Sequence, residues 1–208
     1  KVGTLFEGIW DRATDATRDK AEAGWAQRGK RSGMAKEAWL AAELIKLAWR
    51  QKNHCIVDYW KQLNDAALDA FENQGQTITA GKVKYRVHGS FLWCRLPSGR
   101  ALCYPYPRLE AMINAEHPDG FQEAMTREEA MKLGLPVVGK ARSRLVYKSV
   151  DQWTRKFKEK PFYGGLAMEN IAQAVARDIM AEAMVRLEEA GYPVVLTVHD
   201  EVISERPK

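Results

Sequence analysis

Three consecutive ionisable residues near the end of the chain, His199, Asp200 and Glu201, give the clearest chemical signal. The apolar run 192–198 before them is rich in β-branched residues, and two apolar residues follow them. This pattern predicts a strand, a tight turn and a second strand. A carboxylate held at the rim of a sheet is well placed to bind a divalent metal, and Mg²⁺ in particular prefers oxygen ligands. The turn is therefore a candidate metal site.

A long helix is expected directly before this hairpin, from about residue 166 to residue 190. Its apolar stripe repeats every three to four residues. The stripe consists of Ala172, Val175, Ile179, Ala183 and Leu187. Asn170, Gln173 and Arg177 fall at spacings of three and four on a different face of the helix. Gly191 is placed to end it, so that helix, strand, turn and strand follow one another without a break.

The composition is that of a folded, mildly basic protein. The chain has 208 residues, enough to bury a core, and its seven Trp and seven Tyr argue against disorder. The net charge of +5 suits a polyanionic partner but does not establish one. No apolar run approaches the roughly 20 residues that span a bilayer, so we expect no membrane partner.

The three cysteines, Cys55, Cys94 and Cys103, lack the spacing of metal ligands. We expect reduced thiols that pack as small hydrophobes in a cytosolic protein. Cys94 and Cys103 flank the turn-like segment 96–100. A register centred just after Ser98 would make these two cysteines face each other across a pair of strands.

The first third of the chain is expected to be helical. Short helices and loops are predicted for residues 1–34, with Trp10 and Trp25 as anchors. Apolar residues at spacings of three and four predict helices over 35–51 and from about 55 to 71. Four further tryptophans are expected in the core: Trp39, Trp49, Trp60 and Trp93.

A strand-rich part is expected next. In residues 82–88, Val and Tyr alternate with basic residues, which predicts a half-buried strand with a cationic outer face. Residues 91–96 and 100–104 are predicted to pair as a hairpin, and a helix is predicted over 127–133. The following segment, 140–160, is either a solvated surface or a DNA-binding surface. It carries eight basic residues: Lys140, Arg142, Arg144, Lys148, Arg155, Lys156, Lys158 and Lys160.

Several segments, in this order along the chain, resemble family A DNA polymerases, the DNA polymerase I type. LPSGR at 96–100 is similar to the Gly-Arg strand of the fingers, QAVARDIMAEAM at 173–184 resembles a helix of the polymerase site, and VHDE at 198–201 resembles the final catalytic motif. The sequence of these segments is most similar to that of bacteriophage and prophage members, which carry segments similar to WLAAELIKLAWR from Trp39 and YGG from Tyr163. The resemblance covers nearly the whole chain from Trp39 onward.

The resemblance implies template-directed nucleotidyl transfer with two Mg²⁺ ions. Asp200 resembles the palm carboxylate that binds both ions, Glu201 the neighbouring acid that supports the metal site, and His199 a residue near the primer terminus. Gln173 resembles the glutamine that reads the minor groove beside the terminal base pair. Minor-groove acceptors occur in every base pair, so one donor can check pairing without reading sequence.

Further DNA contacts are implied. Asn170 lies one residue closer to the minor-groove glutamine than the family's asparagine does, and Arg177 shares its helix face. Arg100 is expected to contact the DNA backbone. An arginine that the family carries before this helix is replaced by the Tyr-Gly-Gly sequence. Lys158 and Lys160 are the candidates to take its place.

Two parts of the family's machinery have no counterpart in the chain: the first catalytic aspartate and the fingers helix that grips the triphosphate. Lys1 is expected to follow both. The expected partners are therefore primer–template DNA, dNTPs and a missing N-terminal polymerase segment, whose aspartate would complete the Mg²⁺ site. The chain alone is expected to be inactive, and its location the cytoplasm of a bacterium or of a phage-infected cell.

The expected fold class is α+β. Residues 1–150 would form the later part of the fingers subdomain, mostly helices with a small antiparallel sheet. Residues 151–208 would form the C-terminal part of the palm, with the long helix packed beneath the catalytic hairpin.

Three alternatives stay open. Asp200 can be an ordinary turn aspartate, because Asp favours turns. A metal phosphohydrolase with His and Asp ligands would need further ligands, and only His54, His88 and His117 precede the turn. A non-catalytic DNA-binding remnant or a split-polymerase subunit would keep the DNA contacts without the missing segments.

Overall fold

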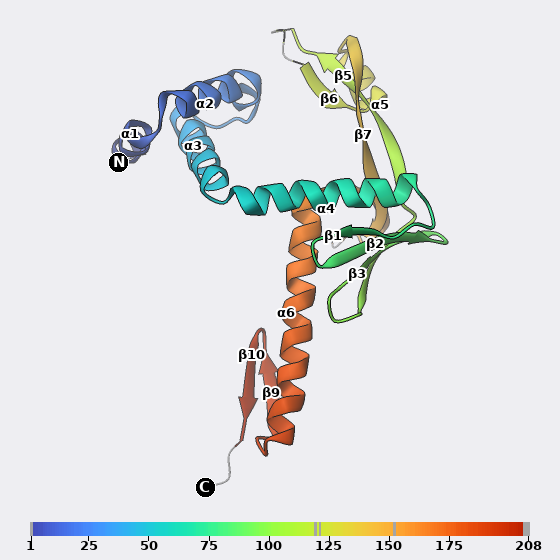
Figure 1. Ribbon diagram of the computed structural model, residues 1–208. Helices are drawn as coiled ribbons and strands as arrows, with labels where there is room; N and C mark the ends of the chain where they lie inside the picture. Colours follow the sequence, from blue (N-terminus) through green and yellow to red (C-terminus); the bar gives the residue numbers. More distant parts are fainter. Residues whose placement is uncertain (1, 119, 121, 152, 206–208) are drawn as a thin grey trace.

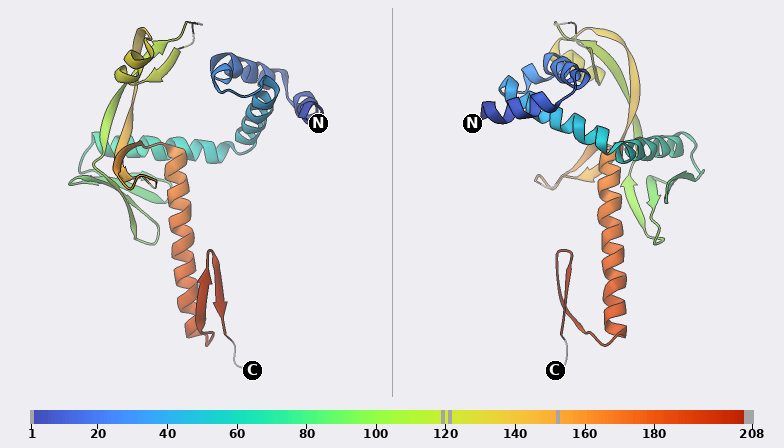
Figure 2. Two further views of the ribbon diagram at one scale, coloured as in Figure 1. Left: turned by 180° about the vertical axis from the view of Figure 1, so that it is seen from behind. Right: turned by 60° about the vertical axis from the view of Figure 1, so that its left-hand side comes forward.

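The computed structural model describes residues 2–118, 120, 122–151 and 153–205. In these residues, six α-helices and three antiparallel sheets form an α+β fold (Figure 1). The expected fold class is confirmed. Two views in Figure 2 show an extended molecule, in which the helical N-terminal part, a β-arm and a long C-terminal helix project from a common centre.

The N-terminal helices pack around a small core of their own. They are α1 (Val2–Arg12), α2 (Asp15–Gln27), the 3₁₀ helix η1 (Gly29–Arg31) and α3 (Lys36–Lys52). Ala21, Leu40 and Leu44 are buried at its centre, and Trp10 and Trp25 pack against them. The prediction that these two tryptophans anchor the N-terminal part is confirmed.

Helix α4 (His54–Glu72) lies across the first sheet and forms the main core with it. The sheet has the order β1-β2-β3-β4. Its strands are β1 (Ile78–Ala80), β2 (Val83–His88), β3 (Phe91–Arg95) and β4 (Ala101–Pro105). Along β2, Val83, Tyr85 and Val87 are buried and the residues between them are exposed, which confirms the predicted half-buried strand with a basic outer face.

The predicted register of the β3–β4 hairpin is wrong by one residue. Cys94 pairs with Leu102 and Cys103 pairs with Trp93, so the hairpin is centred on Ser98. The reason is the odd number of residues, five, in the segment 96–100, whose ends are joined by the Leu96 amide donating to the Arg100 carbonyl. The two cysteines therefore lie on opposite faces of the sheet.

The burial of the cysteines and of two tryptophans also differs from the prediction. Cys94 is buried, whereas Cys55 and Cys103 are exposed, so only one thiol packs in the core. Trp93 is half-buried on the outer face of the sheet and Trp49 is 44% exposed. A strand segment of aromatic residues does not reveal which residues of the strand face the core.

A second sheet forms the β-arm that projects beyond α4 (Figure 1). It has the order β6-β5-β7-β8. Its strands are β5 (Arg108–Glu116), β6 (Gln122–Met125), β7 (Val137–Val150) and β8 (Phe157–Pro161). The sequence predicted only the short helix between them, α5 (Arg127–Leu133), and that prediction is confirmed. Strands make up more of residues 78–150 than the small sheet that was expected.

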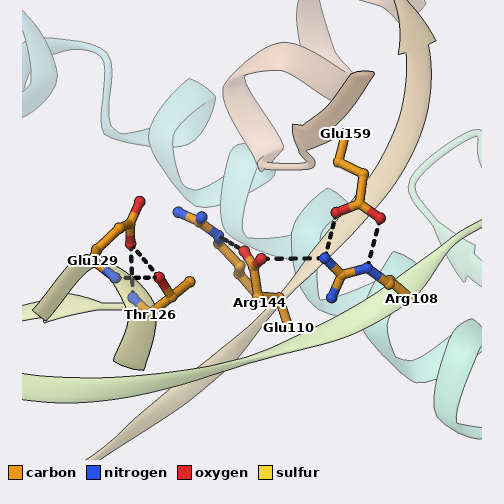
Figure 3. Close-up of polar contacts among 6 residues, drawn as sticks. All are labelled: Arg108, Glu110, Thr126, Glu129, Arg144 and Glu159. Atoms are coloured by element: carbon orange, nitrogen blue, oxygen red, sulfur yellow. Dashed lines mark hydrogen bonds and ion pairs between the residues drawn. The ribbon is translucent and has the colours of Figure 1, made fainter. Parts of the chain in front are cut away.

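Charged side chains link the strands of the arm, as Figure 3 shows. Arg108 bonds to Glu159 on β8 and to Glu110 on its own strand, and Arg144 on β7 donates to Glu110 with Nε 2.6 Å from Oε2. These partners hold the pKa of Arg108 above its usual value and that of Glu159 below its usual value. Some basic residues of the arm are thus already paired with acidic residues of the same arm.

Helix α6 (Gly164–Glu189) begins where it meets α4 and runs as a straight rod away from it (Figure 1). At the meeting point the backbones lie so close that a Cβ on Gly164 would be 1.8 Å from the Trp60 carbonyl oxygen. The predicted apolar stripe is wrong, because the buried residues are Gly164, Ala167, Ile171 and Ala174. Only the first half of the helix packs on α4 and the first sheet, and Ile179 is 63% exposed.

A two-stranded sheet, β9 (Val194–Val198) paired with β10 (Glu201–Ser204), lies along the second half of α6 (Figures 1 and 2). The predicted order of helix, strand, turn and strand is confirmed. Gly191 ends the helix with φ of +80°, and the Tyr192 amide donates back to the Leu187 carbonyl.

The subdomain boundary near residue 150 stays a prediction. Strand β8 pairs with β7 across it, and the main core combines Leu63 and Leu145 with Ala167. Within the described residues, the structure has no helix of the length and apolarity needed to cross a membrane.

Candidate functional site

One face of α6 lines an open cavity of about 390 Å³ against strand β4. Asn170, Gln173 and Arg177 contribute from the helix, as their spacing predicted. Arg100, the last residue before β4, lies in the same lining, with Leu102, Cys103 and Tyr104. The structure therefore brings four of the predicted DNA-binding residues together.

A second cavity, of about 600 Å³, lies between α6 and the β9–β10 hairpin. Gln173 and Arg177 line this cavity too, and His199, Asp200 and Val202 line it from the hairpin. The remaining wall is apolar: Ala176, Ile179, Met180 and Ala183. Since Gln173 and Arg177 belong to both cavities, the helix joins the predicted DNA contacts to the predicted metal turn.

The turn itself consists of two residues, His199 and Asp200, because Glu201 already pairs with Val198 as the first residue of β10. His199 has a φ of +54°, which is uncommon for a residue other than glycine. All three ionisable side chains are exposed. Backbone strain of this kind gathers at functional sites.

The carboxylates fit the metal expected from the sequence. Mg²⁺ is commonly held by one or two protein carboxylates together with water and substrate phosphates. Asp200 is exposed on the turn and lines the cavity, whereas Glu201, the first residue of β10, is exposed beside it but does not line that cavity. In the part of the chain that the structure describes, no three His, Cys, Asp or Glu side chains gather as a complete metal site. Asp200 and Glu201 would therefore form one part of such a site.

The phosphohydrolase alternative finds no support in this arrangement. The cavity that contains Asp200 is lined by none of His54, His88 and His117. Its histidine is His199, the immediate neighbour of Asp200.

Arg100 is held by residues that sequence reasoning did not single out. Its Nε donates to Asp178 Oδ1 at 2.7 Å and its Nη2 donates to the Ala174 carbonyl at 2.8 Å. Ser98 also donates to Asp178, at 2.6 Å. The Ser98 hydroxyl and the Arg100 guanidinium lower the pKa of Asp178. Asp178, an acid in the 173–184 segment, is visible in the sequence. Its neighbours in the sequence do not indicate that it would contact Arg100 and Ser98.

Asn170 is fixed by the core rather than free on the helix. Its amide donates to the Tyr104 hydroxyl at 3.3 Å, and Tyr104 is buried, with its ring edge-to-face on Tyr147 and Phe162. Burial raises the pKa of Tyr104, so the hydroxyl stays protonated. Gln173 is exposed, with its amide 3.4 Å from a Glu169 oxygen, and can reorient toward a ligand.

Lys158 and Lys160 lie apart from this group. They are on β8, and the linings of both α6 cavities are made by other residues. Lys158 pairs with Asp151, N to O 3.4 Å, and the bonds that Asp151 accepts from Thr154 help to lower the pKa of this aspartate to about 2. The structure does not bring these lysines beside Gln173, and their role in DNA binding stays a prediction.

Comparison with known proteins points to a class, the DNA polymerases of bacteriophages. The chain is 33% identical over 166 residues, or 80% of its length, to the DNA polymerase of Bacillus phage SP02. It spans about a fifth of that relative, 22% of its length. No protein-family model and no solved structure matches the chain. The resemblance to a phage DNA polymerase is confirmed, and the assignment to family A stays a prediction.

Proposed function

We propose that this chain is the later fingers and C-terminal palm portion of a phage-type family A DNA polymerase. The observation that carries the proposal is the cavity that Gln173 and Arg177 share with His199 and Asp200. These four residues come from two elements, α6 and the turn of the hairpin. The similarity to a phage DNA polymerase over 80% of the chain supports the same conclusion.

Each residue has a distinct task in this proposal. Asp200 and Glu201 hold Mg²⁺, and bound Mg²⁺ would activate the primer 3′-hydroxyl and stabilise the leaving pyrophosphate. Gln173 donates to the minor groove at the primer terminus, where an acceptor is present in every base pair. Arg177, beside it, neutralises backbone phosphate. His199 lies next to the primer end.

Arg100 and Asn170 position this face. Arg100 has its Nε and Nη2 committed to α6, but its side chain is 48% exposed. It can therefore contact a DNA phosphate and hold the helix at once. Asn170 is bonded to Tyr104 and keeps the start of the helix face in register with β4.

A further polymerase segment is the proposed partner of the hairpin. Val195, Leu196 and Ile203 are 62%, 56% and 45% exposed. In the described residues, β9 and β10 pair only with each other. Exposed strand edges and apolar faces are usually covered by another element. The covering segment would also bring the first aspartate of the metal site, and the dNTP would bind between the two parts.

Primer extension tests the proposal. The assay compares this chain alone, the chain joined to an upstream segment that carries the first aspartate, and the joined protein with Asp200→Ala. Extension by the joined protein alone is the expected result. Inactivity of the joined protein would favour a non-catalytic DNA-binding remnant, and extension by its Asp200→Ala variant would remove Asp200 from the metal site.

A further inference from the structure

A stretch of the chain away from the metal turn is free of acidic residues. From Asn73 to Leu109 there is no Asp or Glu, while the stretch contains Lys82, Lys84, Arg86, Arg95, Arg100 and Arg108. These residues include all of the first sheet. A surface formed by this stretch is therefore positively charged, because the stretch has no acidic residue to neutralise its basic ones.

Strand alternation sends much of this charge to one face of the sheet. Lys84, Arg86 and His88 are the exposed residues of β2, and Val83, Tyr85 and Val87 between them face the core. The partner strand β3 contributes Arg95, which is exposed and pairs with Lys84. We call this side, opposite the core, the outer face.

Aromatic rings lie between these cations. Trp93 pairs with Arg86 and Phe91 pairs with His88, and both rings are half-buried on the outer face. The ring centroids of Phe91 and Trp93 are 5.6 Å apart. Tyr106 extends the row, with its ring 6.1 Å from that of Phe91.

Tyr106 is held in an exposed position at a backbone cost. Its side chain is 54% exposed, and its φ of +50° is uncommon for a large residue. Its amide donates to the Ser90 carbonyl at 2.7 Å. The Lys148 ammonium lies 5.4 Å from the ring centroid, which adds a cation at the end of the aromatic row.

The cations of the outer face are available to a ligand. In the described part of the chain, Lys84, Arg86 and Arg95 take part in none of the ion pairs, which contrasts with Arg108 and Arg144 in the neighbouring arm. The outer face also continues into the α6 cavity, because Cys103 pairs with Trp93 on this face and lines the cavity with Gln173.

We propose that the outer face of the first sheet binds single-stranded DNA, with bases stacked on Trp93, Phe91 and Tyr106 and phosphates on Lys84, Arg86 and Arg95. Sheets and grooves that combine exposed aromatic rings with cations are the usual platforms for unpaired strands. The choice of DNA rests on the proposed polymerase function. In that setting, the template strand would pass from the α6 cavity onto this sheet.

The test is fluorescence anisotropy of a labelled thymidine oligonucleotide about 15 nucleotides long, titrated with the 208-residue chain without metal or dNTP. Trp93→Leu and Phe91→Leu keep apolar bulk but remove the stacking surface. Each should weaken binding about 5- to 150-fold. Trp93→Phe should retain most of the affinity, and thermal unfolding of each variant checks that the sheet is intact.

A charge variant tests the phosphate contacts. Lys84→Gln combined with Arg86→Gln should weaken binding and reduce the slope of log affinity against log salt by about 1.4. The control is Lys61→Gln with Lys132→Gln, which removes two exposed cations elsewhere on the surface and should leave the slope near the wild-type value.

Two results would overturn the proposal. One is leucine variants that bind the oligonucleotide within twofold of the wild type. The other is a Trp93→Leu variant whose affinity for a blunt duplex falls as much as its affinity for the single strand. Stacking on this face requires unpaired bases, so only single-strand binding should fall. A joined protein that fails in primer extension while these variants still lose single-strand binding would contradict the polymerase proposal alone.

Discussion

Arg100 and Asp178 join the β3–β4 turn to the middle of α6, with Nε 2.7 Å from Oδ1, although 78 residues separate them in the chain. Ser98 donates to the same carboxylate, and Arg100 Nη2 donates to the Ala174 carbonyl one helical turn earlier. The turn is thus hydrogen-bonded to the part of the helix from which Gln173 and Arg177 line the two cavities. This contact, together with the packing of Ala167 and Ile171 in the main core, holds the first sheet in place relative to the proposed DNA-contacting face.

Removing the contact should loosen α6 from the first sheet. Arg100→Gln and Asp178→Asn should each lower the midpoint of urea unfolding, because each leaves the partner's charge without its counterpart. The double variant should lose less unfolding free energy than the sum of the two single losses, since both changes remove one shared interaction. A strictly additive double variant would contradict the coupling seen here.

The same contact predicts a dependence on acid. The pKa of Asp178 is lowered in the folded protein, so the folded state holds its ionised form more strongly than the unfolded chain does. That contribution is complete above the ordinary pKa of about 3.9 and is lost as the pH falls toward the lowered value. Unfolding free energies measured between about pH 6 and pH 3 should therefore fall less in Asp178→Asn than in the wild type. Parallel curves would argue against this role.

Gly164 and Gly165 provide a matched pair at the start of α6. A Cβ at Gly164 would lie 1.8 Å from the Trp60 carbonyl oxygen, a backbone atom that cannot move aside. Gly164→Ala should therefore destabilise the fold by about 3 kcal/mol, near the upper end of overpacking effects. A Cβ at Gly165 would meet only the Tyr163 ring, at 3.2 Å. Gly165→Ala should be neutral or stabilising by up to about 1 kcal/mol, as urea unfolding followed by circular dichroism will show.

The three thiols should differ in reactivity. Burial raises the pKa of Cys94 to about 11, and partial burial also raises that of Cys103. Cys55 is exposed. Alkylation at about pH 8, where the thiolate is the reacting form, should modify Cys55 first, then Cys103, and Cys94 only on unfolding. Peptide mass spectrometry measures the order, and early modification of Cys94 would contradict the buried position.

Local signals account for the parts of the fold that were predicted. Helix α6 ends at a glycine with positive φ, and the hairpin after it was predicted from an apolar run, three ionisable residues and a return to apolar residues. The α6 stripe was misplaced because the helix packs along half its length, and a periodic pattern does not show where its partners end. The β-arm was missed because β5 and β7 are held by contacts such as Glu110 with Arg144, 34 residues apart.

The candidate site divides in the same way. The spacing of Asn170, Gln173 and Arg177 placed them on one face of a helix, and the structure shows them in one cavity. Lys158 and Lys160 were the candidates to replace the arginine that the resembled family carries before this helix, but they lie on β8 in the arm. The contacts of Asp178 and Tyr104 were not predictable, because each joins elements that meet only in the folded chain.

The most direct test of the account is the single-turnover rate of nucleotide incorporation by the joined polymerase carrying Asp200→Asn. The matched control is Glu189→Gln, an exposed acid at the end of α6 outside both cavities. If Asp200 binds the metal, Asp200→Asn should lower the rate at least about 100-fold, as expected when a dominant electrostatic contribution to the transition state is removed, and the control rate should stay near that of the wild type. An Asp200→Asn rate equal to the control rate would contradict the assignment of Asp200 as a metal ligand and with it the proposed function of this turn.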